Sequence, residues 1–256
     1  MEDISYNKGN ERLRFFDLNG KMIDEQEFIS IYSKEYFLGG DGNIPGIRRS
    51  SYYIENEICK ILKSEISGKE DVTKVMAWKI GKTKHKESDI SKNFVFSSDW
   101  DETEKHNPSL YGKRFNLKKL SEFIVSDRKN LSALAKNKPQ EFLNKLRDQD
   151  IEGLGTVYMI ALLFFMSGGD QPIYDPFAMV ALKALYCGIC PSDRDKVSVR
   201  DLPDKKSKAF NSVVEKEYGC YIKMLSGLET DYRKCRDLDR ALWVYGHLVI
   251  EKCTRR

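Results

Sequence analysis

Two glycines mark the stretch best suited to phosphate binding, Gly153-Leu154-Gly155, which precedes the apolar segment 156–166. Glycine is needed where φ is positive or where the backbone approaches a partner closely. A helix that begins after such a turn presents N–H groups without intrahelical partners and the positive end of its dipole. The stretch therefore predicts an anion-binding turn at Gly153, Leu154, Gly155 and Thr156, suited to a phosphate. A helix hairpin that needs glycine only for steric reasons is the alternative.

A carboxylate stands at the next apolar segment, where Asp175 directly precedes Pro176. Aspartate at the N-cap and proline at the first helical position are strong signals for a helix start. The helix dipole there favours the ionised carboxylate by roughly 0.3–1 kcal/mol. Asp175 is thus predicted to be the N-cap of this helix, and the capping pattern by itself indicates only a structural role.

Apolar side chains recur at helical spacing through most of the chain. We therefore expect helices to position the glycine turn and Asp175. The expected helices span residues 25–37, 52–66, 117–125, 140–146, 155–166, 176–186, 206–225 and 237–251. Segments 12–18 and 93–98 could be short strands, and the glycine-rich segment 38–46 is expected to be a loop. The sequence predicts a mainly α protein.

The length of 256 residues, with 41% hydrophobic residues, suits one large domain or two small lobes that share a cleft. The helix pattern favours an amino-terminal lobe of residues 1–126 and a second lobe of residues 127–256. In this arrangement the two lobes can interleave.

The formal net charge of +4 is small, but its distribution is uneven. The run from Lys74 to Lys86 holds five lysines and no acidic residue, whereas acidic residues gather in segment 99–104. Smaller basic clusters are formed by Arg48, Arg49, Lys113, Arg114, Lys118 and Lys119. Such segregation is compatible with a phosphate-facing surface and equally with a solvated face.

Several classes of protein find no support in the sequence. The longest apolar run, 157–166, is too short to cross a bilayer, and the charged start has no signal-peptide core. We therefore expect no membrane partner and a cytoplasmic, nucleoid-associated or nuclear location. Cys187 and Cys190 have the spacing of zinc ligands, but Cys220 and Cys235 are too far apart in sequence to form the second pair, so neither a metal nor another cofactor is expected. Motifs of P-loop enzymes, serine hydrolases and zinc proteases are absent.

The segment from Pro139 to Leu185 resembles the helix-hairpin-helix DNA glycosylase superfamily (HhH-GPD). In that family a hairpin similar to Gly153-Leu154-Gly155 grips DNA phosphate, and an essential aspartate begins the next helix. Asp175 matches that aspartate and follows Val157 by 18 residues. The nearest branch is that of the 8-oxoguanine glycosylases. The resemblance implies a two-lobed helical fold and a DNA glycosylase with Asp175 as its catalytic carboxylate.

The chain differs from the family at the position of the lysine nucleophile. Members with lyase activity carry a lysine two residues after the second hairpin glycine, where this chain has Val157. Valine cannot form a Schiff base. The resemblance therefore implies a monofunctional enzyme in which water attacks C1′, although Lys145 or the run from Lys74 to Lys86 could supply a substitute amine. Phe177 stands where some members have a histidine.

A glycosylase must flip its target base into a pocket. The aromatic residues that we consider for this pocket are Tyr174, Tyr158, Phe177 and Trp78, with core packing as the alternative for each. Tyr174 is favoured because it directly precedes Asp175. Nothing in the sequence identifies the base.

Two other functions stay open at this stage. The chain could be an inactive DNA-binding or lesion-recognition module of the same fold, an alternative favoured by Val157 at the position of the family's lysine. It could also be a protein whose hairpin packs against another protein. The expected partner is duplex or single-stranded DNA with a damaged or modified base, bound by a monomer.

Overall fold

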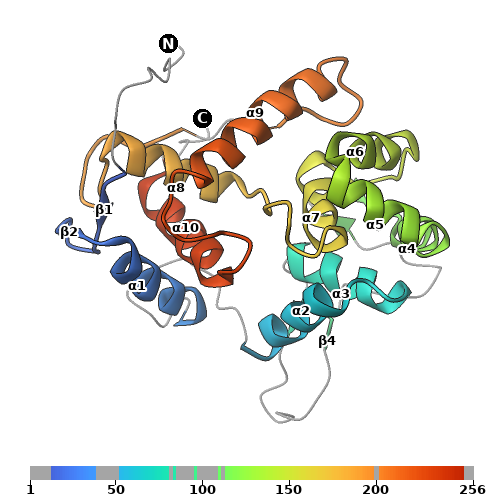
Figure 1. Ribbon diagram of the computed structural model, residues 1–256, viewed down its shortest axis with the longest axis horizontal. Coiled ribbons are helices and arrows are strands. Elements are labelled where there is room, and N and C mark those ends of the chain that lie inside the picture. Colours follow the sequence, from blue (N-terminus) through green and yellow to red (C-terminus); the bar gives the residue numbers. More distant parts are fainter. Residues whose placement is uncertain are drawn as a thin grey trace.

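A computed structural model describes residues 13–38, 52–80, 83–84, 95–96, 109–110, 113–198 and 202–250 (Figure 1). The described residues are mainly helical, as predicted. The helices are α1 (Glu25–Leu38), α2 (Tyr52–Ser64), α3 (Lys69–Ile80), α4 (Leu117–Ser126), α5 (Arg128–Asn137), α6 (Pro139–Asp148), α7 (Thr156–Met166), α8 (Pro176–Cys187), α9 (Phe210–Leu225) and α10 (Arg236–Val249).

Within these ranges the strands are two residues long and form three antiparallel pairs. These pairs are β1 (Phe15–Phe16) with β2 (Met22–Ile23), β3 (Thr83–Lys84) with β4 (Val95–Phe96), and β5 (Ser109–Leu110) with β6 (Lys113–Arg114). Both expected strand segments contain one of these strands. The eight expected helices are present, although α9 begins at Phe210 and not at residue 206, and α3 and α5 were not predicted.

The helices pack in two groups (Figure 1). Helix α10 packs most extensively against α1 and α8, so the first helix joins the last ones. Helices α2 and α3 pack with α4 and α7, and α5 and α6 complete this second group. Helix α9 contacts both α6 and α8, and the chain between α7 and α8 crosses from one group to the other (Figure 1).

Helix α7 lies at the centre of the second group, against α2, α3, α5 and α6. Its sequence is apolar nearly all round, as expected for a helix buried on all sides, and only Val157 and Tyr158 are partly exposed. Helix α7 is therefore buried in the core along most of its length, and its first turn is its most exposed part.

The expected boundary near residue 126 stays a prediction. The contacts of α1 with α10 cross that boundary. Several sequence expectations lie outside the described residues: the loop residues 39–46, the basic residues Arg48, Arg49 and Lys86, and the acidic segment 99–104. No helix in the described ranges has both the length and the apolar character needed to span a membrane.

Gly246 fixes how closely α10 approaches the start of α8. A Cβ atom at this position would lie 1.9 Å from the carbonyl oxygen of Phe177 and 2.6 Å from its carbonyl carbon. Backbone cannot yield as a side chain can, so Gly246→Ala must push the two helices apart. We expect the free energy of unfolding to fall by about 2–3 kcal/mol, at the upper end of overpacking costs, in a urea titration.

Gly219→Ala is the matched control. Gly219 is exposed in the interior of α9, and a Cβ atom added there would have no neighbour within 4 Å. Alanine has the higher helix propensity, so this variant should gain about 0.5–1 kcal/mol. A Gly246→Ala protein as stable as Gly219→Ala would show that the α8–α10 contact is looser than described.

Candidate active site around Asp175

Asp175 is the N-cap of α8, as its sequence context predicts. Its backbone is extended, and its Oδ1 accepts a hydrogen bond from the N–H of Phe177 at 3.0 Å. Pro176 occupies the first helical position, where no N–H is required. The cap uses one carboxylate oxygen, and the other is available to a second partner.

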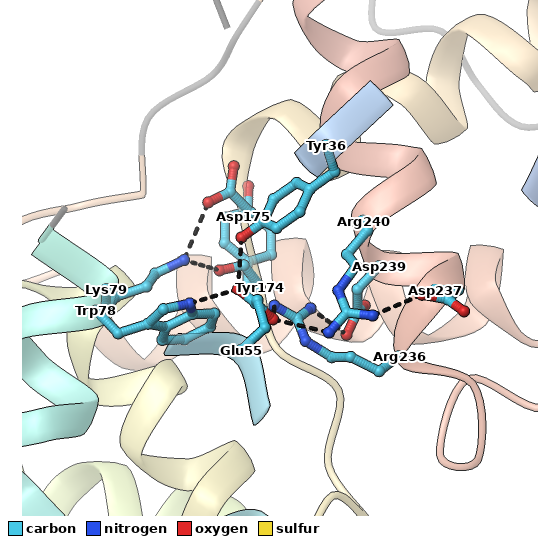
Figure 2. A network of polar contacts seen from close by, with 10 residues as sticks. All are labelled: Tyr36, Glu55, Trp78, Lys79, Tyr174, Asp175, Arg236, Asp237, Asp239 and Arg240. Atoms are coloured by element: carbon cyan, nitrogen blue, oxygen red, sulfur yellow. Dashed lines mark hydrogen bonds and ion pairs between the residues drawn. The ribbon is translucent and has the colours of Figure 1, made fainter. Parts of the chain in front are cut away.

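The second partner is Lys79, near the end of α3. Its Nζ lies 3.0 Å from Asp175 Oδ2 and also donates to the carbonyl oxygen of Tyr174 at 3.5 Å. Only 9% of the Lys79 side chain and 20% of the Asp175 side chain are exposed. The site therefore joins an amine and a carboxylate in a partly desolvated position, and Figure 2 shows the pair.

Glu55 of α2 organises a buried polar network beside this pair (Figure 2). Its Oε1 accepts from Tyr36 Oη at 2.9 Å and from Trp78 Nε1 at 2.8 Å. Its Oε2 accepts from Arg240 Nη2 at 2.9 Å and lies 3.5 Å from Arg236 Nη2. Trp78 and Lys79 are consecutive, so the network anchors the segment that carries the amine.

Helix α10 supplies both arginines of the network. Arg236 also binds Asp239 at 3.1 Å, and Arg240 binds Asp237 at 2.6 Å. Burial alone raises the pKa of Glu55, but the charges of Arg236 and Arg240 and the hydrogen bonds from Arg240 and Trp78 outweigh it and lower the pKa to about 2. Burial raises the pKa of Asp239 to about 6 in spite of Arg236. The pKa values of the two carboxyl groups are therefore shifted in opposite directions.

The glycine turn lies between α6 and α7. Asp150 and Gly153 have positive φ, of 44° and 79°, and the N–H of Leu154 donates to Ile151 O at 3.3 Å. Gly155 is the N-cap of α7, with extended backbone and no side-chain cap. No side-chain hydrogen bond caps the N-terminus of α7, and anion binding at this turn stays a prediction.

The protein itself binds carbonyl groups of the turn. Lys119 Nζ donates to Gln149 O at 2.6 Å, the N–H of Asn116 donates to Glu152 O at 3.0 Å, and Lys205 Nζ donates to Ile151 O. These contacts fix the backbone of the turn. They also place lysines next to it.

The two side chains predicted at the turn point inward. Leu154 is buried in the core. Thr156 is also buried, and its hydroxyl donates to Pro203 O at 2.6 Å. A phosphate at this turn would therefore meet backbone N–H groups and not the threonine hydroxyl.

Two of the four aromatic pocket candidates lie beside Asp175. Trp78 is partly buried, with the guanidinium of Arg236 5.2 Å from its ring centre. Tyr174 is 1% exposed and packs edge-on against Tyr221, with ring centres 5.2 Å apart. A flipped base would reach the Tyr174 ring only after neighbouring side chains moved.

The other two candidates lie in different surroundings. Phe177 is partly buried and stacks on His247 of α10, with ring centres 3.5 Å apart. Burial lowers the pKa of His247, and its Nδ1–H donates to Trp243 O at 2.7 Å. Tyr158 lies in the first turn of α7, where its ring covers Gly155. Tyr158 is therefore associated with the turn, whereas Phe177 lies in the first turn of α8, two residues after Asp175.

Glu55 and the pairing of Lys79 with Asp175 were missed by sequence reasoning. The run from Lys74 to Lys86 was considered only for its positive charge, and helix α3, which contains its first part, was not predicted. Val72, Val75 and Met76 are buried at helical spacing and were the signal for this helix. No comparable signal marks Glu55, whose partners come from α1, α3 and α10.

Comparisons with known proteins give no identification: no family model, curated protein or solved structure matches the chain. In the described part of the chain, no three His, Cys, Asp or Glu side chains gather where they could hold a metal ion.

Proposed function

We propose that the chain is a DNA N-glycosylase with the two-lobed fold of the HhH-GPD superfamily, and that Asp175 is its essential carboxylate. The observation that carries this proposal is the fixed position of the Asp175 carboxylate and its pairing with an amine. It is fixed as the cap of α8, and its Oδ2 meets only a partly buried amine in the described contacts. The turn at Gly153 and Gly155 supports the same function, because α7 begins there without a side-chain cap.

The chemistry follows from charge. Cleavage of an N-glycosidic bond gives the sugar oxocarbenium character, and a nearby carboxylate stabilises that positive charge. Unit charges about 4 Å apart attract by roughly 4 kcal/mol at an effective dielectric constant of about 20. A fixed carboxylate in a partly desolvated site is suited to this role, because it needs little reorganisation during the reaction.

Release of free base from oligonucleotides tests the function directly. Duplex and single-stranded substrates with a panel of damaged or modified bases are incubated with the protein, and the released base is quantified by chromatography. We expect release from at least one substrate. Salt-sensitive DNA binding without release from any substrate would favour the second candidate, an inactive recognition module, which the apolar Val157 supports.

Lys206 provides a test of the DNA-binding turn. Its side chain is 71% exposed, and its Nζ lies 3.6 Å from Asp150 Oδ1 at the turn. A lysine that neutralises one phosphate contributes about 0.9 to the slope of log K against log salt. We expect Lys206→Glu to weaken DNA binding and to reduce this slope by about one, as measured by fluorescence anisotropy at several salt concentrations.

Lys138→Glu is the matched control. Lys138 precedes α6, at the opposite end of that helix from the turn, and its side chain is 61% exposed and paired with Glu141 at 2.8 Å. Both substitutions change the net charge equally. If the two variants lose the same affinity and slope, the turn is not the phosphate contact.

A further inference from the structure

Lys79 is placed where stability alone does not require a lysine. Burial of an ammonium group is costly unless it is paired, and a buried ion pair is often no more stabilising than an apolar replacement. Asp175 is already satisfied as a cap by the N–H of Phe177. A chemical role explains the pair better than a stabilising one.

The position of Lys79 is also well fixed. The adjacent Trp78 donates to Glu55 and packs edge-on against Phe165 of α7, with ring centres 5.8 Å apart. Helix α3 is thereby held against α7, the helix on which Val157 replaces the family lysine. The amine enters the site from a different helix.

We propose that Lys79 is an amine nucleophile that forms a Schiff base with C1′ of an abasic deoxyribose in DNA. This inference rests on the proposed function, because base release produces the abasic sugar. Lysine differs from arginine in that it can lose its proton and then attack an aldehyde. The 3.0 Å between Lys79 Nζ and Asp175 Oδ2 lets one carbon atom approach both groups.

Asp175 can move every proton that the addition requires. Lys79 gives a proton to Asp175, and the neutral amine adds to the C1′ aldehyde of the open sugar to form a carbinolamine. Asp175 returns the proton to the hydroxyl group, which leaves as water, and a protonated imine joins Nζ to C1′. The carboxylate is ionised again at the end of this step.

Strand cleavage follows by β-elimination. Asp175 takes a proton from C2′, the C3′–O bond breaks, and the 3′ phosphate leaves with the bonding electrons. Water then hydrolyses the imine, which releases an unsaturated aldehyde on the DNA and restores the Lys79 amine. No oxidant, reductant or metal is consumed.

Reductive trapping tests the inference without knowledge of the base. The full chain is incubated with a duplex oligonucleotide that carries one abasic site, in the presence of cyanoborohydride, which reduces an imine to a stable protein–DNA bond. We expect trapping by the wild type. Lys79→Arg keeps the positive charge beside Asp175 but forms no imine, so the trapping rate should fall by roughly 100-fold or more.

Lys145→Arg is the matched control. Lys145 Nζ also lies 3.0 Å from an aspartate oxygen, Asp127 Oδ2, but its side chain is 43% exposed and lies on α6. This variant should trap DNA like the wild type. Peptide mapping of the reduced adduct should identify Lys79 as the modified residue.

The possible outcomes separate the two proposals. Undiminished trapping by Lys79→Arg, or loss of trapping in Lys145→Arg, would overturn the assignment of Lys79. Base release by a wild type that traps no abasic DNA would also overturn it and leave the glycosylase proposal standing. Absence of both base release and trapping would reject both proposals.

Discussion

Asp175→Asn is expected to slow base release by roughly 1,000-fold in the single-turnover rate. The substitution removes the negative charge that stabilises the sugar, which is worth about 4 kcal/mol at 4 Å, and each 1.36 kcal/mol corresponds to a factor of ten in rate. The rate is measured with enzyme in excess over the substrate that the wild type processes best.

Asparagine preserves the structural role of this residue. Its side-chain oxygen can still cap α8 and accept from the N–H of Phe177, and asparagine is as good an N-cap as aspartate. The cap is therefore kept, but the buried Lys79 ammonium loses its anionic partner, so the variant is expected to be less stable. The rates are compared well below the thermal midpoint of the variant, where both proteins are folded, which separates lost chemistry from lost folding. Base release within tenfold of the wild type would contradict a catalytic role for Asp175.

Asp127→Asn is the control for this experiment. Asp127 precedes α5, and its Oδ2 is paired with Lys145 at the same 3.0 Å distance that separates Asp175 from Lys79. It has the same type of partner but lies outside the proposed site. Its base release should match that of the wild type.

Local signals made most of the fold predictable. Pro139 and Pro176 mark the first positions of α6 and α8, and Gly188, with φ of 70°, ends α8 in the left-handed conformation. Helix α5 escaped prediction because it buries only Leu131 and Ala135, too few apolar positions to establish a period. The mainly helical class was therefore evident, whereas the grouping of the helices was not.

The candidate site was predictable only in its local parts. Asp175 and the turn at Gly153 have signals within a few residues of themselves. Lys79 lies 96 positions from Asp175, and Arg240 lies 185 positions from Glu55. These pairs depend on how α2, α3 and α10 pack against other helices. The spacing of residues within one segment does not predict such contacts.

The Glu55 network gives the largest expected effect on stability. Glu55 is 1% exposed and is the shared anion of Arg236 and Arg240, whose side chains are 16% and 11% exposed. Glu55→Gln keeps the shape of the side chain but leaves two buried guanidinium groups without this charge. Removal of one member of a buried ionic group costs about 3–5 kcal/mol, and we expect a loss of this size in urea unfolding at pH 7.

Glu57→Gln is the control on the same helix. Glu57 pairs with Lys60 at 2.6 Å, and 73% of the Lys60 side chain is exposed. Exposed pairs contribute about 0–1 kcal/mol, so this variant should remain close to the wild type. Equal losses in the two variants would mean that Glu55 is not the centre of the network.

The pH dependence identifies the charge of Glu55 as the cause. Its pKa is lowered to about 2 in the folded protein, whereas an unfolded glutamate titrates near about 4.3. The unfolded state therefore binds more protons between these values, and the stability that the charge contributes is lost as the pH falls through them. The difference between wild type and Glu55→Gln should be full above about pH 5 and shrink toward pH 2, because a protonated Glu55 is as neutral as glutamine. A difference that stays constant over this range would assign the loss to packing and hydrogen-bond geometry, since neither changes with the protonation of Glu55.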